Sequence, residues 1–171
     1  MTTGEGLSVE AYAGARGLAL LRLAVMLTGT ASDAEDLLQT TYERLLRNWD
    51  KVAAASQPHA YARRVMVNEF LQWKRSPSQR ESPVEHLPEP TAYEESTAGT
   101  DDDGWRLLAT LPKQQRATLA LRYYEDLPDE RIAEILGCSH ATVRSNASRG
   151  LATLRDTHRT PRQDLDKEAG R

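Results

Sequence analysis

Apolar residues recur every three or four positions over two long parts of the chain, a spacing that places them on one face of a helix. In the first part this period predicts helices from about Val9 to Thr28, over "DLLQTTYERLLRNW", and over "HAYARRVMVNEFLQWKR", which ends before Pro77. In the second part it predicts helices over "KQQRATLALRYYE", over "DERIAEIL" and from about His140 to Thr157. No run of alternating β-branched residues indicates a strand. The pattern therefore predicts an all-α fold.

Residues that start and stop helices refine these limits. Gly29 suits the end of the first helix, and Ser32 and Glu35 have the spacing of a capping box at the start of the second. Pro112 and Pro128 suit the first turns of two later helices, and "DKVAAASQP" is expected to be a loop. The predicted core faces consist of Leu18, Leu21, Ala24, Val25 and Thr28 on the first helix, Leu38, Tyr42, Leu45 and Trp49 on the second, and Ala62, Val65, Met66, Phe70 and Trp73 on the third.

A stretch of different composition, "SPSQRESPVEHLPEPTAYEESTAGTDDDG", separates the two helical parts. It holds four of the eight prolines and eight acids against one base, and it shows neither a helical nor a strand period. Low hydrophobicity and repulsion between like charges favour a flexible acidic linker. We therefore expect an N-terminal helical bundle over residues 1–75, a linker over 76–104, a four-helix domain over 105–160 and a disordered tail over 161–171.

The uneven distribution of charge changes what the net charge of −3 implies. The linker stretch alone carries −7, so the rest of the chain carries +4, with 21 bases against 17 acids. A negative total thus conceals basic helical domains, and it does not exclude a nucleic-acid partner.

The stretch "IAEILGCSHATVRSNASRGLATLR" has the pattern of a helix-turn-helix. Ala133 is small enough for two helices to approach, Gly137 permits a left-handed turn, and Val143 fills the space between the helices. Ser139 is expected to cap the second helix, whose face with Val143, Ala147, Leu151 and Leu154 is directed at the core. The opposite face carries small and hydrogen-bonding side chains that fit a major groove, although a solvated amphipathic helix would look similar. The residues predicted to contact duplex DNA are Ser139, His140, Thr142, Arg144, Ser145, Ser148 and Arg149.

The third N-terminal helix combines cations with aromatic side chains, a combination typical of single-strand binding. Its cations can follow a phosphate backbone, while aromatic rings stack on bases or, alternatively, belong to the core. The residues predicted to contact a separated strand are Tyr61, Arg63, Arg64, Asn68, Lys74 and Arg75.

Composition argues against several other classes of protein. The single Cys138 cannot form an internal disulfide, no Cys/His cluster has zinc spacing, and no cofactor motif occurs. The four histidines are scattered and no nucleophile–base set emerges, so an enzyme is not expected. No export signal is apparent, and the apolar stretch "GLALLRLAVML" is short and contains Arg22, so we expect a cytoplasmic protein that does not insert into a membrane.

Three stretches together resemble a known family: "DAEDLLQTTYERLLRNWDKV", "AYARRVMVNEFLQWKR" and "LATLPKQQRATLALRYYEDLPDERIAEILGCSHATVRSNASRGLATLR". They are similar to bacterial RNA polymerase sigma factors, in particular the extracytoplasmic-function (ECF) group of the sigma-70 family, which keeps only regions 2 and 4. The resemblance covers about Ala15 to Arg75 and Trp105 to Asp156. Its most specific elements are "DAEDLLQ" and "LPKQQRATLALRYYEDL".

The resemblance implies a protein that binds core RNA polymerase and directs promoter-specific initiation. It implies that the helix-turn-helix reads duplex minus-35 DNA, and that the third helix with its preceding loop recognises and opens the minus-10 element. The implied partners are the β′ coiled coil and the β flap of polymerase, promoter DNA and an anti-sigma factor. The resemblance assigns polymerase binding to Asp36, Gln39, Tyr42, Glu43 and Leu46. Tyr42 is equally a core candidate, and acids early in a helix also suit its N-terminal dipole or a solvated face.

The main alternative is a stand-alone helix-turn-helix regulator whose N-terminal part dimerises or binds a ligand. Such a regulator would bind its operator without polymerase.

Overall fold

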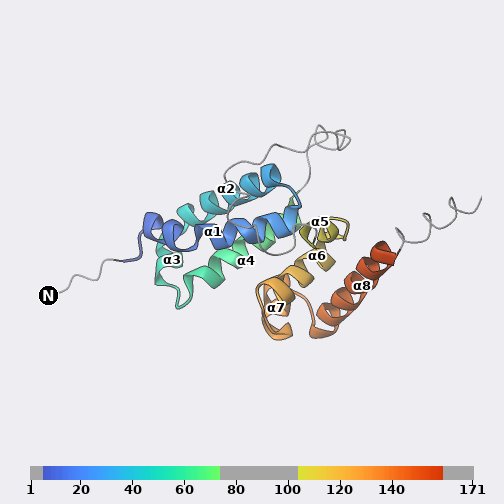
Figure 1. The fold of residues 1–171 in the computed structure, drawn as a ribbon. Helices are drawn as coiled ribbons and strands as arrows, with labels where there is room; N and C mark the ends of the chain where they lie inside the picture. Colours follow the sequence, from blue (N-terminus) through green and yellow to red (C-terminus); the bar gives the residue numbers. More distant parts are fainter. Residues whose placement is uncertain (1–5, 74–103, 160–171) are drawn as a thin grey trace, which may run out of the picture.

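The computed structural model describes residues 6–73 and 104–159, and these ranges contain helices and connecting turns (Figure 1). No strand occurs within them, so the predicted all-α class is confirmed. Residues 74–103, which hold Lys74, Arg75 and almost all of the predicted linker, lie outside the described ranges, as does the predicted tail. The elements are α1 (Val9–Thr28), α2 (Ala31–Arg47), α3 (Trp49–Ala54), α4 (Pro58–Gln72), α5 (Gly104–Leu108), α6 (Lys113–Leu119), the π-helix η2 (Ala120–Tyr124), α7 (Asp129–Leu136) and α8 (His140–Arg159).

The helices α1, α2 and α4 pack together as the N-terminal bundle, drawn from blue to green in Figure 1. The buried face of α1 agrees with the prediction at Ala24 and Thr28. It also takes in Leu20, Leu23 and Leu27, whereas the predicted Leu18 is 48% exposed. This helix contacts α2 and α4 and also α5, α6 and η2. Its buried surface is therefore wider than the single stripe that a surface helix shows. Gly29 ends the helix as predicted, with φ at 85°.

Thr30, rather than Ser32, caps α2. The helix begins at Ala31, and Oγ1 of Thr30 accepts a hydrogen bond from the backbone N–H of Asp33 at 3.1 Å. The predicted capping box of Ser32 and Glu35 is therefore wrong by two residues. Thr30 and Ser32 are both good caps followed three positions later by an acid, so the pattern fits either register.

The segment after α2 is helical where a loop was expected. Trp49–Ala54 form α3, and the loop that remains before α4 is only three residues long, Ala55–Gln57. The core of the bundle takes in Ala62, Met66 and Phe70 from α4 as predicted, and also Val67, which lies off the predicted stripe. Leu45 of α2 is fully buried, whereas Leu38, Tyr42 and Trp49 are only partly so.

The C-terminal domain begins with α5 and continues with a helix that changes type. The predicted helix over "KQQRATLALRYYE" is α6 followed directly by the π-helical turn η2, closed by a bond from Glu125 N–H to the carbonyl of Ala120 at 3.1 Å. Pro112 and Pro128 stand one position before α6 and α7, rather than inside their first turns. Either position leaves the missing proline N–H without consequence for the helix.

The predicted helix-turn-helix is present in α7 and α8. Gly137 ends α7 with φ at 64°, a left-handed conformation that glycine adopts without a steric penalty. Ala133 is 5% exposed and Val143 is fully buried between the helices. Ser139 caps α8, since its Oγ accepts from the N–H of Thr142 at 3.1 Å. A Cβ at Gly150 would lie 2.9 Å from Cδ1 of Leu119, so this glycine allows α8 to lie close to α6.

The two domains share one apolar core. Ala117, Leu121 and Ile132 of the C-terminal domain belong to the same buried cluster as Leu27 and Phe70 of the bundle. Figure 1 shows α6 and α7 between α4 and α8, so the C-terminal domain meets the bundle through its first helices and leaves α8 on the outside.

One helix in the described ranges, α1, has the length and composition to cross a membrane, with a mean hydropathy of 1.2. This helix is longer than the stretch "GLALLRLAVML", which was too short to predict a membrane-spanning segment. The core helix of a water-soluble protein passes the same test, and α1 buries Leu20, Leu23 and Leu27 inside the bundle.

Replacement of the observed cap tests the register of α2. Thr30→Ala is expected to lower the free energy of unfolding by about 1 kcal/mol, because the N–H of Asp33 loses its acceptor. Ser32→Ala serves as the matched control and is expected to change it by less than about 0.5 kcal/mol. Urea unfolding followed by circular dichroism measures both. A larger loss in the Ser32 variant would restore the capping box and contradict the observed start of α2.

Candidate functional site

The outward face of α8 presents most of the residues predicted to contact duplex DNA. His140, Arg144, Ser148 and Arg149 are exposed, while Val143 and Ala147 on the opposite face are buried against the domain. Ser139 and Thr142 are also exposed, but their hydroxyls lie 2.9 Å apart at the start of the helix, where Ser139 acts as the cap. Ser145 is half-buried. The arrangement gives a rigid helix with two arginines and small side chains facing outward.

The residues predicted to contact a separated strand are less uniformly accessible. Arg64 is exposed and Asn68 half-buried on α4, and Tyr61 packs against the apolar core with part of its surface open. The alternative expectation, that the aromatic rings belong to the core, therefore holds for part of Tyr61.

Arg63 differs most from its predicted role, because it faces the C-terminal domain. Its Nη1 donates to Oε2 of Glu125 at 2.8 Å, and the two side chains are 13% and 12% exposed. The guanidinium is therefore occupied by a carboxylate from the other domain.

A second polar contact links the start of α4 to α1. The hydroxyl of Tyr12 lies 3.1 Å from Nδ1 of His59. Burial raises the pKa of Tyr12, so its hydroxyl stays protonated and can donate a hydrogen bond to Nδ1 of His59. Burial, and then the nearby cations Arg63 and Arg16, lower the pKa of His59, which agrees with a neutral ring that accepts this bond.

The residues predicted to bind polymerase form a surface on the outer side of α2. Asp36, Gln39 and Glu43 are exposed, and Leu46 is a 53% exposed leucine beside them. Tyr42 is half-buried against the core, and burial raises the pKa of its hydroxyl. A Cβ at Gly17 would lie 3.1 Å from that hydroxyl, so a glycine on α1 makes room for it. Tyr42 thus lies partly in the core and partly on the surface of α2.

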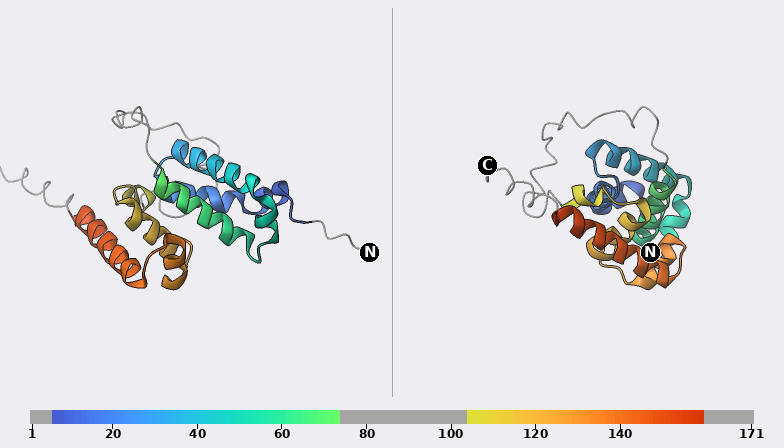
Figure 2. Two further views of the ribbon diagram at one scale, coloured as in Figure 1. Left: turned by 180° about the vertical axis from the view of Figure 1, so that it is seen from behind. Right: turned by 90° about the vertical axis from the view of Figure 1, so that its right-hand side faces the viewer.

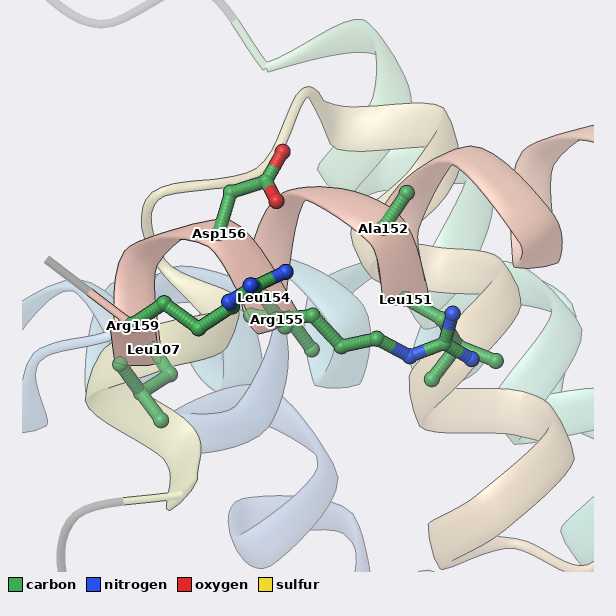
Figure 3. Close-up of a pocket in the computed structure, with 7 residues that line it drawn as sticks. All are labelled: Leu107, Leu151, Ala152, Leu154, Arg155, Asp156 and Arg159. Carbon is green, nitrogen blue, oxygen red and sulfur yellow. The ribbon is translucent and has the colours of Figure 1, made fainter.

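An open groove of about 560 Å³ lies between α5 and the end of α8, and it was not predicted (Figure 3). Leu107, Leu151 and Leu154 line it, with the side chains of Arg155 and Arg159 alongside. The sequence stripe placed Leu151 and Leu154 in the core, but both are only half-buried. The continuation of that stripe to the last turns of α8 is the signal that could have indicated an apolar surface.

Cys138 is a partly buried free cysteine in the turn of the helix-turn-helix. Burial raises the pKa of the Cys138 thiol, which disfavours the reactive thiolate. Within the ranges that the structure describes, no group of three or more His, Cys, Asp and Glu residues could hold a metal ion.

Comparison with known proteins assigns both domains. The family model Sigma-70 region 2 matches residues 15–80, and Sigma-70, region 4 matches residues 105–154. The RNA polymerase sigma-E factor of Streptomyces avermitilis is 38% identical over 171 residues, which cover 99% of this chain and 94% of that protein. The sigma-E factor of Streptomyces coelicolor is 37% identical and covers 97% and 93%.

Solved structures share the fold. The sigma factor RpoE of Bartonella quintana, solved in complex with the anti-sigma factor NepR, has a TM-score of 0.64 at 24% identity and covers 90% of this chain and 100% of that one. The extracytoplasmic-function sigma factor SigJ of Mycobacterium tuberculosis has a TM-score of 0.63 at 25% identity, and the match covers 86% of this chain and 53% of that one.

The fold and the two family matches define a two-domain helical protein of transcription, with a helix-turn-helix in its second domain. The chain belongs to the sigma-70 family of RNA polymerase sigma factors, in the extracytoplasmic-function group. It directs promoter-specific initiation with core RNA polymerase, and the match to region 2 disfavours a stand-alone helix-turn-helix regulator.

The burial of His59 makes the free energy of unfolding depend on pH. The pKa of His59 is lowered from 6.5 in the folded chain, so the unfolded chain binds this proton more readily. The free energy of unfolding is therefore highest at a pH above 6.5, the pKa of His59 in the unfolded chain. It falls as the pH drops from there towards the lower pKa of His59 in the folded chain. Between about pH 7.5 and about pH 5.5, His59→Gln should lose less free energy of unfolding than the unaltered protein in urea titrations. An equal loss in both proteins would show that His59 does not carry the effect.

Proposed function

We propose that three separate surfaces divide the work of this sigma factor. The outward face of α8 binds duplex minus-35 DNA, the exposed side of α4 binds separated minus-10 DNA, and the outer side of α2 binds the β′ coiled coil of core polymerase. The observation that carries the proposal is the outward direction of Arg144 and Arg149 on a helix whose other face is fixed by buried Val143 and Ala147. We also propose that the N-terminal bundle spans residues 1–75 and that the C-terminal domain spans residues 105–160.

The duplex assignment is supported by the chemistry of α8. Arginine binds guanine with two hydrogen bonds in the major groove, and small neighbours let the helix approach the base edges. Ser139 and Thr142 at the start of the helix contribute through their position beside the backbone phosphates, and His140, Ser145 and Ser148 border the same face.

The single-strand assignment is supported by Arg64, Asn68 and the open part of Tyr61 on α4. A cation, an amide and a ring are the groups that hold a backbone, read a base edge and stack on a base. Arg63 joins them once it is free of Glu125. Lys74 and Arg75 extend the same sequence and belong to the proposal on the sequence alone.

The polymerase assignment has two parts. Leu46 supplies an exposed apolar contact among the polar groups of Asp36, Gln39 and Glu43, which suits an interface with an apolar centre and a polar rim. The apolar groove of Leu107, Leu151 and Leu154, with arginines alongside, suits an amphipathic helix that carries acids at its edges, and we assign it to the β flap.

We propose that the protein acts in the cytoplasm, where core polymerase is found. It regulates transcription without a catalytic step or a cofactor of its own. An anti-sigma factor is a further proposed partner. A relative in fold, the sigma factor of Bartonella quintana, was solved with one, which supports this part of the proposal.

Loss of a base-reading arginine tests the duplex assignment. With polymerase holoenzyme, Arg144→Ala or Arg149→Ala should weaken promoter binding by about 1–3 kcal/mol, roughly 5- to 150-fold. The loss should shrink when the minus-35 sequence is scrambled, because the specific contact is then already absent. Arg16→Ala, which removes an exposed cation of α1, is the matched control. Equal losses in all three variants, or equal losses on both templates, would refute base reading by α8.

Truncation on α2 tests the polymerase assignment. Leu46→Ala should weaken binding to core polymerase about tenfold, or about 1.4 kcal/mol, if it lies near the centre of the interface. Thr40→Ala, at another exposed position of the same helix, should leave the affinity within about twofold. Fluorescence anisotropy of labelled protein titrated with core polymerase measures both, after circular dichroism has verified folding. If Leu46→Ala and Gln39→Ala both bind core polymerase with unchanged affinity, the assignment of α2 to the polymerase interface is refuted.

A further inference from the structure

A cluster of aromatic rings lies where the start of α1 meets α3 and the start of α4 (Figure 2). Tyr12 of α1 is only 3% exposed and contacts a ring on either side of the loop 55–57. Its ring centroid lies 5.8 Å from that of Trp49, which begins α3, and 6.4 Å from that of His59, in the first turn of α4. One buried side chain thus touches both of the helices that carry this loop.

Two hydrogen bonds tie the same parts together. The hydroxyl of Tyr12 lies 3.1 Å from Nδ1 of His59, and the burial that lowers the pKa of His59 favours the neutral ring that this bond needs as its acceptor. On the other side of the loop, Nε1 of Trp49 donates to the carbonyl of Leu7 at 2.8 Å. The segment before α1 is therefore tied to α3, and the first turn of α1 is tied to α4.

The position of the loop depends on these contacts, because its flanking helices are poorly fixed by local bonds. The helix α3 is six residues long, too short to be stable without tertiary contacts. Neither α3 nor α4 has a side-chain hydrogen bond that caps its start. Apart from the buried Val52, Trp49 is the residue that anchors α3, and it does so against Tyr12 and Leu7.

The loop itself presents groups that can read a base. Ser56 and Gln57 are exposed, and the Gln57 side chain is not used to cap α4. A hydroxyl and an amide on a short loop suit the hydrogen-bonding edge of a base that has left the stack. Reading of this kind requires groups that are held to within about 0.5 Å by the packing of their neighbours. The Tyr12 cluster is the packing that supplies this support.

We propose that Tyr12, together with Trp49 and His59, forms a positioning clamp that sets the loop 55–57 for sequence-specific reading of the separated minus-10 strand. The proposal rests on the proposed function of α4, and it extends that surface to the loop before the helix. The three clamp residues act through the loop and not by contact with the strand. Specificity for minus-10 DNA therefore depends on α1, a helix that contains none of the predicted strand contacts.

Selection of promoter sequences by the holoenzyme tests the clamp. A pool of duplex templates randomised at both promoter elements is incubated with core polymerase and the full chain, and heparin-resistant open complexes are sequenced. The unaltered protein should enrich particular bases at both elements. Tyr12→Phe keeps the ring and removes the hydroxyl. It should lower the enrichment at minus-10 about fivefold, which corresponds to one neutral hydrogen bond of about 1 kcal/mol, and leave the enrichment at minus-35 within about twofold.

Variants of the acceptor separate positioning from packing. His59→Leu should match Tyr12→Phe, and the double variant should lose no more than either single variant, because both changes remove the same bond. His59→Gln keeps an acceptor and should restore most of the enrichment at minus-10. Trp49→Phe removes the donor to Leu7 but keeps a ring, so it repeats the test from the other side of the loop. Tyr124→Phe, which removes a hydroxyl from η2, is the matched control, and circular dichroism verifies that each variant is folded.

The two promoter elements distinguish the outcomes. Equal losses at minus-10 and minus-35 would show that the cluster only stabilises the bundle, and the clamp would be refuted. If Tyr12→Phe and His59→Leu both keep the minus-10 preference of the unaltered protein, the clamp is refuted and the assignment of α4 to the strand stands. If the unaltered holoenzyme has no preference at minus-10, the strand assignment itself fails, and the clamp fails with it.

Discussion

Two cations from one short helix fix how the parts of this sigma factor sit together. The last turns of α1 and α4 contain no basic residue of their own, although helix C-termini carry unsatisfied carbonyls and a partial negative charge. Arg116 donates to Leu27 at the end of α1, and Lys113 donates to Phe70 at the end of α4. Both cations also lie over the Phe70 ring, at 5.4 and 5.6 Å. A cation at a partly buried helix C-terminus stabilises the fold by on the order of 1 kcal/mol. The helix α6 therefore supplies the basic side chains that the last turns of α1 and α4 lack.

The placement of α6 determines which surfaces the chain presents. With α6 seated on the ends of α1 and α4, α7 lies against α4 and η2 against α1. Glu125, the residue after η2, reaches Arg63 of α4. The helix α8 then lies on the outside (Figure 2). Arg144 and Arg149 of α8 are exposed, as are Asp36, Gln39 and Glu43 of α2. The proposed polymerase and duplex surfaces are thus accessible together, while the proposed strand surface is partly covered. This order suits a protein that joins polymerase before it meets melted DNA.

Much of this arrangement follows from local sequence patterns. The turn of the helix-turn-helix agrees with the prediction, because Gly137, Ala133 and Val143 each have a role set by backbone geometry and short-range packing. The cap of α2 was misplaced because Thr30 and Ser32 satisfy the same rule, and α3 was missed because "DKVAAA" lacks a clear apolar period. Leu18 was assigned to the core because one helix period cannot represent a helix with partners on several sides.

The contacts between the domains could not be predicted in this way. Arg63 reads as a nucleic-acid contact in the sequence because its partner, Glu125, lies 62 positions away and is directed by a π-helical turn that no periodicity indicates. The carbonyls bound by Lys113 and Arg116 carry no sequence signal at all, since every residue has one. Long-range polar pairing therefore separates the observed surface of α4 from the predicted one: Arg64 is exposed and Asn68 half-buried, whereas Arg63 is paired with Glu125.

Amide hydrogen exchange of the full chain, free and bound to core polymerase with promoter DNA, tests this account most directly. In the free chain, the last turns of α1 and α4 and the length of α6 should be protected together, because one domain contact covers them. In the promoter complex, α2 and α8 should gain protection while the contact between α6 and the end of α4 loses it. If the ends of α1 and α4 exchange quickly in the free chain, or if their protection is unchanged in the complex, the two domains do not close on each other as described.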